Sequence, residues 1–211
     1  MHIGVPREIK PLEGRVGLIP AACSGLVSAG HAVYIESGAG AQSGYSDEAY
    51  RAAGAQITAN AAELYEQGQL IVKVKEPLEG DLRYLRSDHI LFSYLHLAAN
   101  AALTRNLCSI GLTALAFETV QLASGELPLL APMSDIAGRL SVHLGANLLH
   151  QPQGGKGLLL GGLAGAERGR VTVIGGGTAG GNAARVAAAL GAGVTVFDRK
   201  RSKLEAMREL G

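Results

Sequence analysis

The sequence predicts an α/β protein with two doubly wound parallel-sheet domains, the second of which is incomplete in this chain. Short β-branched or aliphatic runs alternate with longer helical patterns, and this alternation is typical of parallel α/β architecture. Near the C-terminus an apolar run leads directly into a glycine-rich turn. The 30 glycines in 211 residues are about twice the usual share, which indicates that the backbone needs room at several places.

The first domain is predicted over residues 1–127, with five strands and intervening helices. We expect its strands at residues 3–5, 32–36, 70–74, 90–94 and 112–117. Helices are expected over residues 20–29, from Ser46 onward, and from Asn100 to about residue 108. Pro20 suits the first position of a helix and Gly30 suits its C-terminal cap.

The second domain is predicted over residues 128–211 and opens with a bridging helix from residue 133 to about residue 150. A strand, a helix, a second strand and a second helix follow, at residues 171–174, 182–190, 194–197 and 201–210. A parallel sheet hides its strands between helices, so this β-α-β-α unit leaves apolar edges uncovered. We expect other segments or subunits to complete the sheet.

Composition excludes several classes of function. With 19 basic and 18 acidic residues, the net charge of +1 gives little support to binding of nucleic acids or anionic membranes. The chain has neither a membrane-spanning apolar run nor a signal peptide, so we expect a cytoplasmic location. Cys23 and Cys108 are far apart and are expected to be reduced, buried thiols. His143 and His150 share a helix face but lack a third ligand, so no metal site is predicted.

The glycine-rich turn carries the strongest motif, in which Gly175, Gly177 and Gly180 form GxGxxG between a strand and a helix. In Rossmann-like domains the first glycine makes the tight turn, the second lets a pyrophosphate approach the backbone, and the third lets helix and strand pack closely. The helix N-terminus then offers unpaired N–H groups to the phosphates. This context favours a dinucleotide site over a purely structural turn.

The second strand of this unit ends at Asp198, 18 residues after Gly180. A carboxylate at this place binds the ribose hydroxyls of NAD, whereas the 2′-phosphate of NADP would meet a like charge. The sequence therefore favours NAD. The basic side chains of Arg199, Lys200 and Arg201 keep NADP as an alternative, because they could neutralise a 2′-phosphate.

Three polar side chains follow different strands of the first domain. Arg15 lies in the segment after the first strand, Lys75 at the end of the third, and His96 after the fourth. A guanidinium and an ammonium suit a small carboxylate with an adjacent carbonyl, and an imidazole exchanges protons near neutral pH. Each residue also has a structural interpretation without a ligand: Arg15 as a solvated loop residue, Lys75 as a strand-end charge kept out of the core, and His96 as a histidine with its hydrogen bonds satisfied. Lys73 shares the face of Lys75 at period two, so alternation does not choose between them.

Several motifs occur in order along the chain. They are GVPRE at 4–8, EGRV at 13–16, ESGAG at 36–40, KVKEP at 73–77, YLH at 94–96 and APMS at 131–134, followed by Gly138-Arg139. Together with GGGTAG at 175–180 they resemble the family of alanine dehydrogenase and the nucleotide-binding alpha subunit of proton-translocating transhydrogenase. The resemblance covers all 211 positions, and members of this family continue well beyond Gly211.

This resemblance implies the reversible oxidative deamination of L-alanine to pyruvate and ammonia with NAD, in a cytoplasmic homo-oligomer that is usually a hexamer. It implies that Arg15 binds the substrate carboxylate, that Lys75 binds the carboxylate or carbonyl oxygen as part of the catalytic site, and that His96 is the general acid/base catalyst. The complete members also supply a catalytic aspartate from beyond this segment, so the short chain alone is expected to be a poor catalyst.

For the cofactor, the resemblance implies that Ser134 and Thr178 contact the dinucleotide, that Asp198 binds the adenosine ribose, and that Lys203 lies on the adenosine side. Two alternatives stay open. One is a non-catalytic dinucleotide-binding module, and the other is a transhydrogenase component that passes hydride between two nucleotides.

Overall fold

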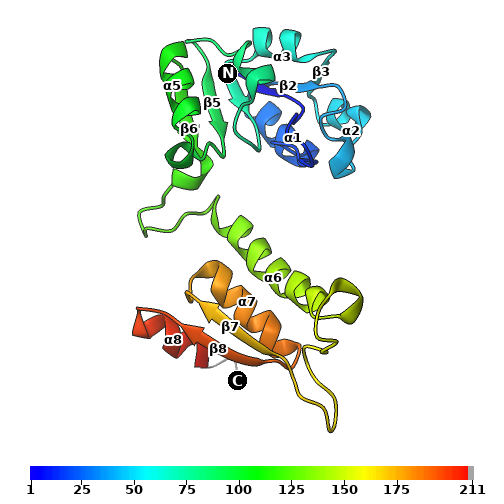
Figure 1. The fold of residues 1–211 in the computed structure, drawn as a ribbon. Helices are drawn as coiled ribbons and strands as arrows, with labels where there is room; N and C mark the ends of the chain where they lie inside the picture. The colour runs from blue at the N-terminus through cyan, green and yellow to red at the C-terminus, as the bar shows by residue number, and fades with distance from the viewer. Residues whose placement is uncertain (209–211) are drawn as a thin grey trace. The chain divides into compact units, whose positions relative to one another are not determined.

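The computed structural model describes residues 1–208 and divides into two compact units, one from Met1 to Glu126 and one from Leu127 onward (Figure 1). The last residues of the helix predicted over 201–210 lie outside the described part. Within that part, each helix is too short or too polar to traverse a lipid bilayer.

The first unit is built on a sheet of six parallel strands. They are β1 (His2–Val5), β2 (Ala32–Glu36), β3 (Gln56–Thr58), β4 (Leu70–Val72), β5 (Ile90–Ser93) and β6 (Thr113–Ala116). Their order, β3-β2-β1-β4-β5-β6, is that of a doubly wound sheet and confirms the predicted fold class. The order reverses between β1 and β4, and ligands of such sheets bind beyond the carboxyl ends of the strands at this point.

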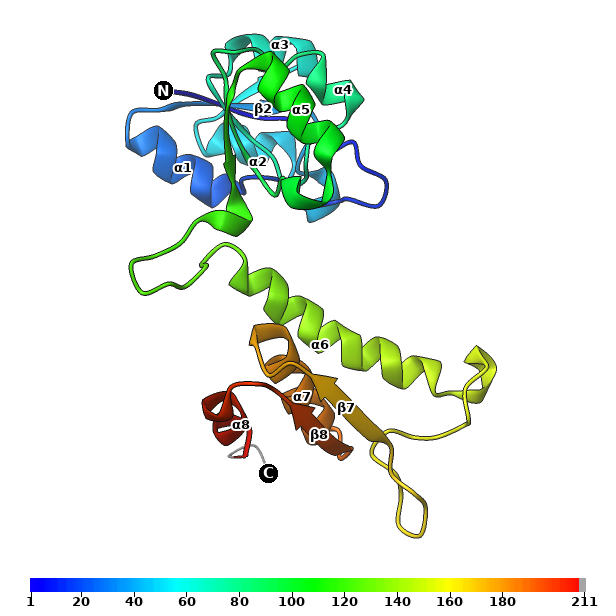
Figure 2. The same cartoon turned by 60° about the vertical axis from the view of Figure 1, so that its left-hand side comes forward.

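Helices cover both faces of this sheet (Figures 1 and 2). They are α1 (Pro20–Ser28), α2 (Asp47–Ala52), α3 (Ala61–Gln67), α4 (Glu79–Leu82) and α5 (Ala101–Ile110). On one face Ile3 and Val5 of β1 pack with Tyr50 of α2. On the other face Ile71 of β4 packs with Leu64 of α3. The period-two pattern of the strands thus builds two separate apolar layers.

The sequence prediction missed β3, α3 and α4. β3 has three residues, of which Gln56 is exposed, so it shows no apolar alternation. α3 does carry a start signal, because the side chain of Asn60 accepts a hydrogen bond from the amide of Glu63. The expectation of two buried thiols was wrong for Cys108, which is exposed because it lies off the α5 face that buries Leu103 and Leu107.

The second unit contains α6 (Ala131–Leu148), β7 (Arg170–Ile174), α7 (Thr178–Ala189), β8 (Gly193–Phe197) and α8 (Arg201–Arg208). β7 and β8 pair in parallel, with Val171 opposite Val194. α7 begins four residues earlier than predicted, because Gly180 and Gly181 lie inside the helix instead of preceding it.

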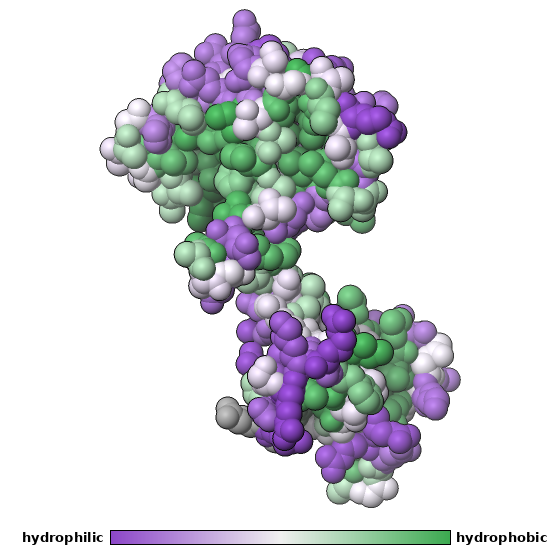
Figure 3. All heavy atoms as spheres, turned by 90° about the vertical axis from the view of Figure 1, so that its left-hand side faces the viewer, coloured by the Kyte–Doolittle hydropathy of each residue, from purple (hydrophilic) through white to green (hydrophobic). Residues whose placement is uncertain are grey.

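Apolar side chains reach the surface of the second unit. Ile174 of β7 and Phe197 of β8 are 89% and 57% exposed. On α6 the exposed apolar residues recur every four positions: Ile136, Leu140, Leu144 and Leu148. Hydrophobic patches are visible on the face drawn in Figure 3.

A buried ion cluster lies where the sheet order reverses. The ammonium of Lys73, just after β4, is 3.3 Å from Asp81 Oδ1 and 3.5 Å from Glu8 Oε2. The hydroxyl of Tyr65 donates to Asp81 Oδ1 at 2.9 Å. The Lys73 side chain is fully buried, whereas Lys75 is partly exposed. The expectation that both lysines share one face was wrong, because β4 ends at Val72 and its alternation does not continue.

We expect Lys73→Met to lower the free energy of unfolding of the first unit by about 3–5 kcal/mol, because it leaves two buried carboxylates without their cation. All six tyrosines lie between residues 34 and 94, so tyrosine fluorescence during urea denaturation reports on this unit. The matched control is Lys75→Met, which removes a partly exposed ammonium and should cost less than about 1 kcal/mol. Equal losses in the two variants would contradict the assigned role of Lys73.

Candidate active site

The carboxyl ends of β1, β4 and β5 bring three chain segments to one edge of the first sheet. Glu8, in the segment after β1, accepts hydrogen bonds at Oε1 from the amides of Val74 at 2.7 Å and Lys75 at 3.4 Å. Its side chain is only 3% exposed. Burial raises the pKa of Glu8, and the charge of Lys73 and the two amides oppose that rise. Glu8 therefore fixes the backbone that carries Lys75.

Arg15 lies in the same segment and forms a two-pronged ion pair with Glu13. Its Nε donates to Glu13 Oε1 at 2.8 Å and its Nη2 donates to Oε2 at 2.6 Å. The hydrogen bond from Arg15 lowers the pKa of Glu13 to about 2, and the charge of Lys75 adds to this lowering. The same bond raises the pKa of Arg15. The guanidinium is thus presented as a fork that already holds a carboxylate.

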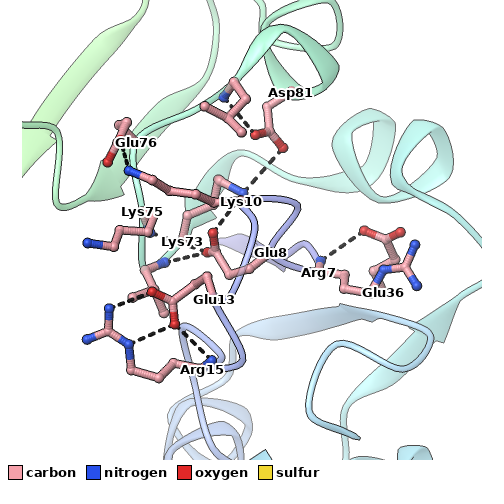
Figure 4. A network of polar contacts seen from close by, with 12 residues as sticks. Arg7, Glu8, Lys10, Glu13, Arg15, Glu36, Lys73, Lys75, Glu76 and Asp81 are labelled. Carbon is pink, nitrogen blue, oxygen red and sulfur yellow. Dashed lines mark hydrogen bonds and ion pairs between the residues drawn. The ribbon is translucent and has the colours of Figure 1, made fainter. Parts of the chain in front are cut away.

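Lys75 and Arg15 extend in the same direction in Figure 4. Beside them Lys10 forms an ion pair with Glu76. Among residues 1–208, Lys75 makes no ion pair, unlike Lys10, Arg15 and Lys73. Its ammonium is therefore a positive charge at this edge that a ligand can engage without breaking an existing ion pair.

His96 follows β5 in a left-handed backbone conformation, with φ of 50° and ψ of 36°. Its amide donates to Glu118 Oε1 at 2.7 Å, and the amide of Leu95 donates to Glu118 Oε2 at 3.3 Å. The imidazole is exposed and stacks on the ring of Tyr94, with the centroids 6.2 Å apart. The ring of His96 is therefore accessible while its backbone is held in place.

Shared neighbours connect the three predicted substrate-site residues. Glu13 pairs with Arg15 and also responds to the charge of Lys75. Tyr94 stacks on His96, and although burial raises the pKa of its hydroxyl, the charge of Arg15 opposes that rise. The structure thus brings Arg15, Lys75 and His96 to the same edge of the sheet. Their binding and catalytic roles stay predictions.

In the second unit the three motif glycines differ in their surroundings. Gly175 has a φ of 101°, which favours glycine. A Cβ on Gly180 would lie 1.8 Å from the carbonyl oxygen of Gly175, so close packing of α7 on the turn requires glycine there. A Cβ on Gly177 would approach only Lys203 Nζ, at 3.7 Å. Internal packing therefore does not explain Gly177, whose bare backbone faces open space at the N-terminus of α7.

Asp198 closes the turn from the end of β8. Its Oδ2 accepts a hydrogen bond from the amide of Gly176 and its Oδ1 accepts one from Lys200, both at 2.7 Å. These amide bonds lower the pKa of Asp198, so the carboxyl is ionised at neutral pH. Lys203 Nζ lies 4.0 Å from Oδ2. Gly175, Asp198 and Lys203 line one open hollow beside the turn.

Ser134 lies in the first turn of α6 and exposed Thr178 begins α7. The neighbouring Asp135 brings these helix starts together, since its Oδ1 accepts a hydrogen bond from Asn182 Nδ2 at 2.6 Å. A Cβ on Gly138 would lie 2.1 Å from the carbonyl oxygen of Ala179, which shows how closely α6 and α7 pack. Among residues 1–208, no three His, Cys, Asp or Glu side chains are grouped to hold a metal ion.

Comparison with known proteins shows the family to which the chain belongs. Residues 4–137 match the family described as alanine dehydrogenase/PNT, N-terminal domain, and residues 141–211 match alanine dehydrogenase/PNT, C-terminal domain. The chain belongs to the alanine dehydrogenase/PNT family. Membership of the alanine dehydrogenase/PNT family implies a pyridine nucleotide as cofactor, and it confirms the resemblance predicted from the sequence.

Curated relatives in the alanine dehydrogenase/PNT family are similar over nearly the whole chain. The chain is 50% identical to an alanine dehydrogenase of Geobacillus stearothermophilus over 210 residues, which are 100% of this chain and 56% of that protein. It is 50% identical to an alanine dehydrogenase of Methanococcus maripaludis over 97% of this chain and 55% of that protein. The chain therefore spans about half the length of the curated relatives it matches.

Solved structures give the same result. A structure titled L-alanine dehydrogenase is 49% identical, with a TM-score of 0.92 over 100% of this chain and 58% of that chain. A transhydrogenase from Sinorhizobium meliloti is 25% identical, with a TM-score of 0.84 over 100% of this chain and 63% of that chain. Both resemblances cover both units of the chain.

Sequence reasoning missed the carboxylates that hold this edge of the alanine dehydrogenase/PNT fold. Glu8 and Glu13 do occur in the motifs that carry the family resemblance, but no spacing indicated that they bind Lys75 and Arg15. Glu118 lies 22 residues from His96, and nothing in the local pattern connects the two. The pairing of β6 with β5 is the feature that brings them together.

We expect Arg15→Met to return the pKa of Glu13 from about 2 towards its usual 4.5, because the variant removes the hydrogen bonds that favour the carboxylate. A lowered pKa in the folded state stabilises the protein above about pH 4.5, and this contribution is lost as the pH falls through about 2. In the variant, the loss of stability that comes from protonation of Glu13 at low pH should disappear. Carbon-13 NMR titration of the Glu13 carboxyl measures the pKa directly. Arg51→Met, in a different ion pair, should leave it unchanged.

We expect Gly180→Ala to destabilise the second unit by about 1–3 kcal/mol, because its Cβ would collide with the backbone of Gly175. The matched control is Gly145→Ala in α6, where a Cβ would have open space and where the change should stabilise the helix by about 1 kcal/mol. Thermal unfolding followed by circular dichroism compares the two. A Gly180 variant as stable as the control would show that the turn does not need this close approach.

Proposed function

We propose that residues 1–127 supply the substrate site, and residues 128–211 the first half of the nucleotide site, of an NAD-dependent alanine dehydrogenase. The reaction converts L-alanine, NAD⁺ and water to pyruvate, ammonium, NADH and a proton, and it is reversible. The observation that carries the proposal is the unpaired ammonium of Lys75, beside the Arg15 fork and the accessible imidazole of His96. These groups match an amino acid that carries a carboxylate next to the reacting carbon.

Arg15 binds the carboxylate of alanine or pyruvate in this proposal. Its ion pair with Glu13 fixes the orientation of the guanidinium, and Glu13 would have to share or yield these hydrogen bonds when the substrate carboxylate binds. Lys75 places a point charge on the carboxylate or the developing carbonyl oxygen. Glu8 accepts a hydrogen bond from the backbone amide of Lys75, which fixes the backbone from which this side chain extends.

His96 is the general acid/base catalyst in this proposal. Histidine is the side-chain type that exchanges protons near neutral pH. The exposed imidazole of His96 is at the same sheet edge as the two cations and can accept a proton from the water that adds to the substrate. It can return that proton to the nitrogen as ammonia leaves.

The residues of the second unit fit a pyridine nucleotide, which supplies the hydride acceptor when it is bound. The open backbone at Gly177 and the N-terminus of α7 suit the pyrophosphate, with Ser134 and Thr178 beside it. The ionised Asp198 suits the ribose hydroxyls of NAD and disfavours the 2′-phosphate of NADP. Lys203 lies beside Asp198, where the adenosine half would bind.

The proposal includes L-alanine and pyruvate as ligands and a homo-oligomer acting in the cytoplasm, which the resemblance implies is a hexamer. The exposed apolar side chains of α6 support association with further protein surface.

The test uses two proteins, the chain itself and the chain joined to the part of the Geobacillus stearothermophilus relative that lies beyond the matched segment. In the joined protein, NADH formation should require L-alanine, should be faster with NAD⁺ than with NADP⁺, and should fall by about 10²–10⁴-fold in His96→Ala. NADH absorbance measures the rate. Nucleotide binding without turnover would instead indicate a non-catalytic module. Hydride transfer between two nucleotides without alanine would indicate a transhydrogenase component.

A further inference from the structure

We propose that Glu118 is a positioning residue that holds His96 in its left-handed conformation and so presents the imidazole to the substrate. The inference rests on the proposed role of His96 and adds a residue that acts through it. Glu118 lies in the short 3₁₀ segment Phe117–Thr119, directly after β6. It is 22 residues from His96 in the sequence.

The two hydrogen bonds of Glu118 match the chemistry of a carboxylate. Each oxygen accepts one of two consecutive amides, Oε1 from His96 at 2.7 Å and Oε2 from Leu95 at 3.3 Å. Leu95 is fully buried, so water cannot replace Glu118 as the partner of its amide. A buried amide without a partner costs about 1–3 kcal/mol, so the native backbone depends on this carboxylate.

The backbone of His96 needs such support because its conformation is strained. In the described part of the chain, His96 and Leu12 are the non-glycine residues with positive φ. For a residue with a Cβ the left-handed region costs about 1–2 kcal/mol. Such strain persists where the surroundings enforce it, and it is concentrated at functional sites. The hydrogen bond from the His96 amide to Glu118 enforces it here.

The segment that carries Glu118 is held in place by the aromatic ring of the preceding residue, Phe117. The ring of Phe117 packs edge-on against Phe92, with the centroids 4.2 Å apart, and against Tyr94 at 5.1 Å. Tyr94 in turn stacks on His96. The segment after β6 is thereby fixed against the end of β5, and its carboxylate is in place before any ligand binds.

Glu8 makes the same kind of contact at the same edge of the sheet. It accepts the amides of Val74 and Lys75 at the end of β4, as Glu118 accepts those of Leu95 and His96 at the end of β5. Glu8 also pairs with the buried Lys73, so its replacement would disturb the core. Glu118 is partly exposed and has no ion pair among residues 1–208, which makes it the better residue to substitute.

The test compares Glu118→Gln with the wild-type full chain by NMR. A glutamine keeps one acceptor oxygen but turns an NH₂ group towards the second amide, so one of the two bonds is lost. We expect His96 to leave the left-handed region, which weakens its intraresidue NOE between the amide and α protons. Glu63→Gln is the matched control, since Glu63 also accepts a backbone amide, that of Ala59 at 2.9 Å, in another part of the unit.

Pyruvate is the probe for the functional part of the test. In the wild-type chain, we expect pyruvate to shift the Cε1–H signal of His96. In Glu118→Gln this shift should disappear while the affinity for pyruvate changes by less than about threefold, because Arg15 and Lys75 make the charge-assisted contacts. General unfolding would abolish both the shift of His96 and the binding of pyruvate. Loss of the shift with binding retained therefore identifies a positioning role.

A double-mutant cycle with His96→Gly, based on the free energy of unfolding, gives a second measurement. Glycine adopts the left-handed conformation without strain, so Glu118→Gln should cost less stability in the His96→Gly chain than in the wild-type chain. The cost of Glu63→Gln should be the same in both. An unchanged NOE together with an additive cycle would overturn the inference and leave the proposed function intact. Failure of the wild-type chain to bind pyruvate would contradict the proposed function, and with it the role of Glu118 in that reaction.

Discussion

The buried ion cluster around the ammonium of Lys73 is the interaction on which the arrangement of the candidate active site depends. A buried cation is tolerated only when it is paired, and Lys73 takes its partners Glu8 and Asp81 from two other segments of the chain. Tyr65 of α3 completes the cluster through Asp81. The ends of β1 and β4 are therefore fixed to each other and to α3. The segments that carry Arg15 and Lys75 begin at this cluster, so the start of each segment is held in place before a ligand binds.

The elements predicted well from the sequence are those that burial alone specifies. The central strands are short apolar runs enclosed by helices, and the GxGxxG turn follows such a run. β3 was missed because it is an edge strand of three residues with little to bury. The start of α7 was misplaced because Gly180 and Gly181 were interpreted as turn residues. Close packing of Gly180 against the carbonyl of Gly175 is the reason for glycine at that position, and that packing exists only in the folded chain.

The candidate site was predicted in part, for a related reason. Arg15, Lys75 and His96 could be proposed because polar residues directly after buried strands lie at one sheet edge. Lys73 and Lys75 could not be separated, since their difference depends on where β4 ends. Glu118 could not be found at all. Its contact with His96 requires β6 to pair beside β5, with Ala116 opposite Ser93, and no local pattern encodes that register.

The distribution of charge shows how cations offset the carboxylates at this edge of the sheet. The buried layer holds one ammonium, that of Lys73, against the two carboxylates of Glu8 and Asp81. Left alone, this layer would repel a carboxylate substrate through a medium of low dielectric constant. In the outer layer two further carboxylates are each neutralised by a cation, and Lys75 remains as an additional positive charge. With Lys75 included, the charges of these eight side chains sum to zero, so loss of Lys75 would leave a net negative charge that repels an anion.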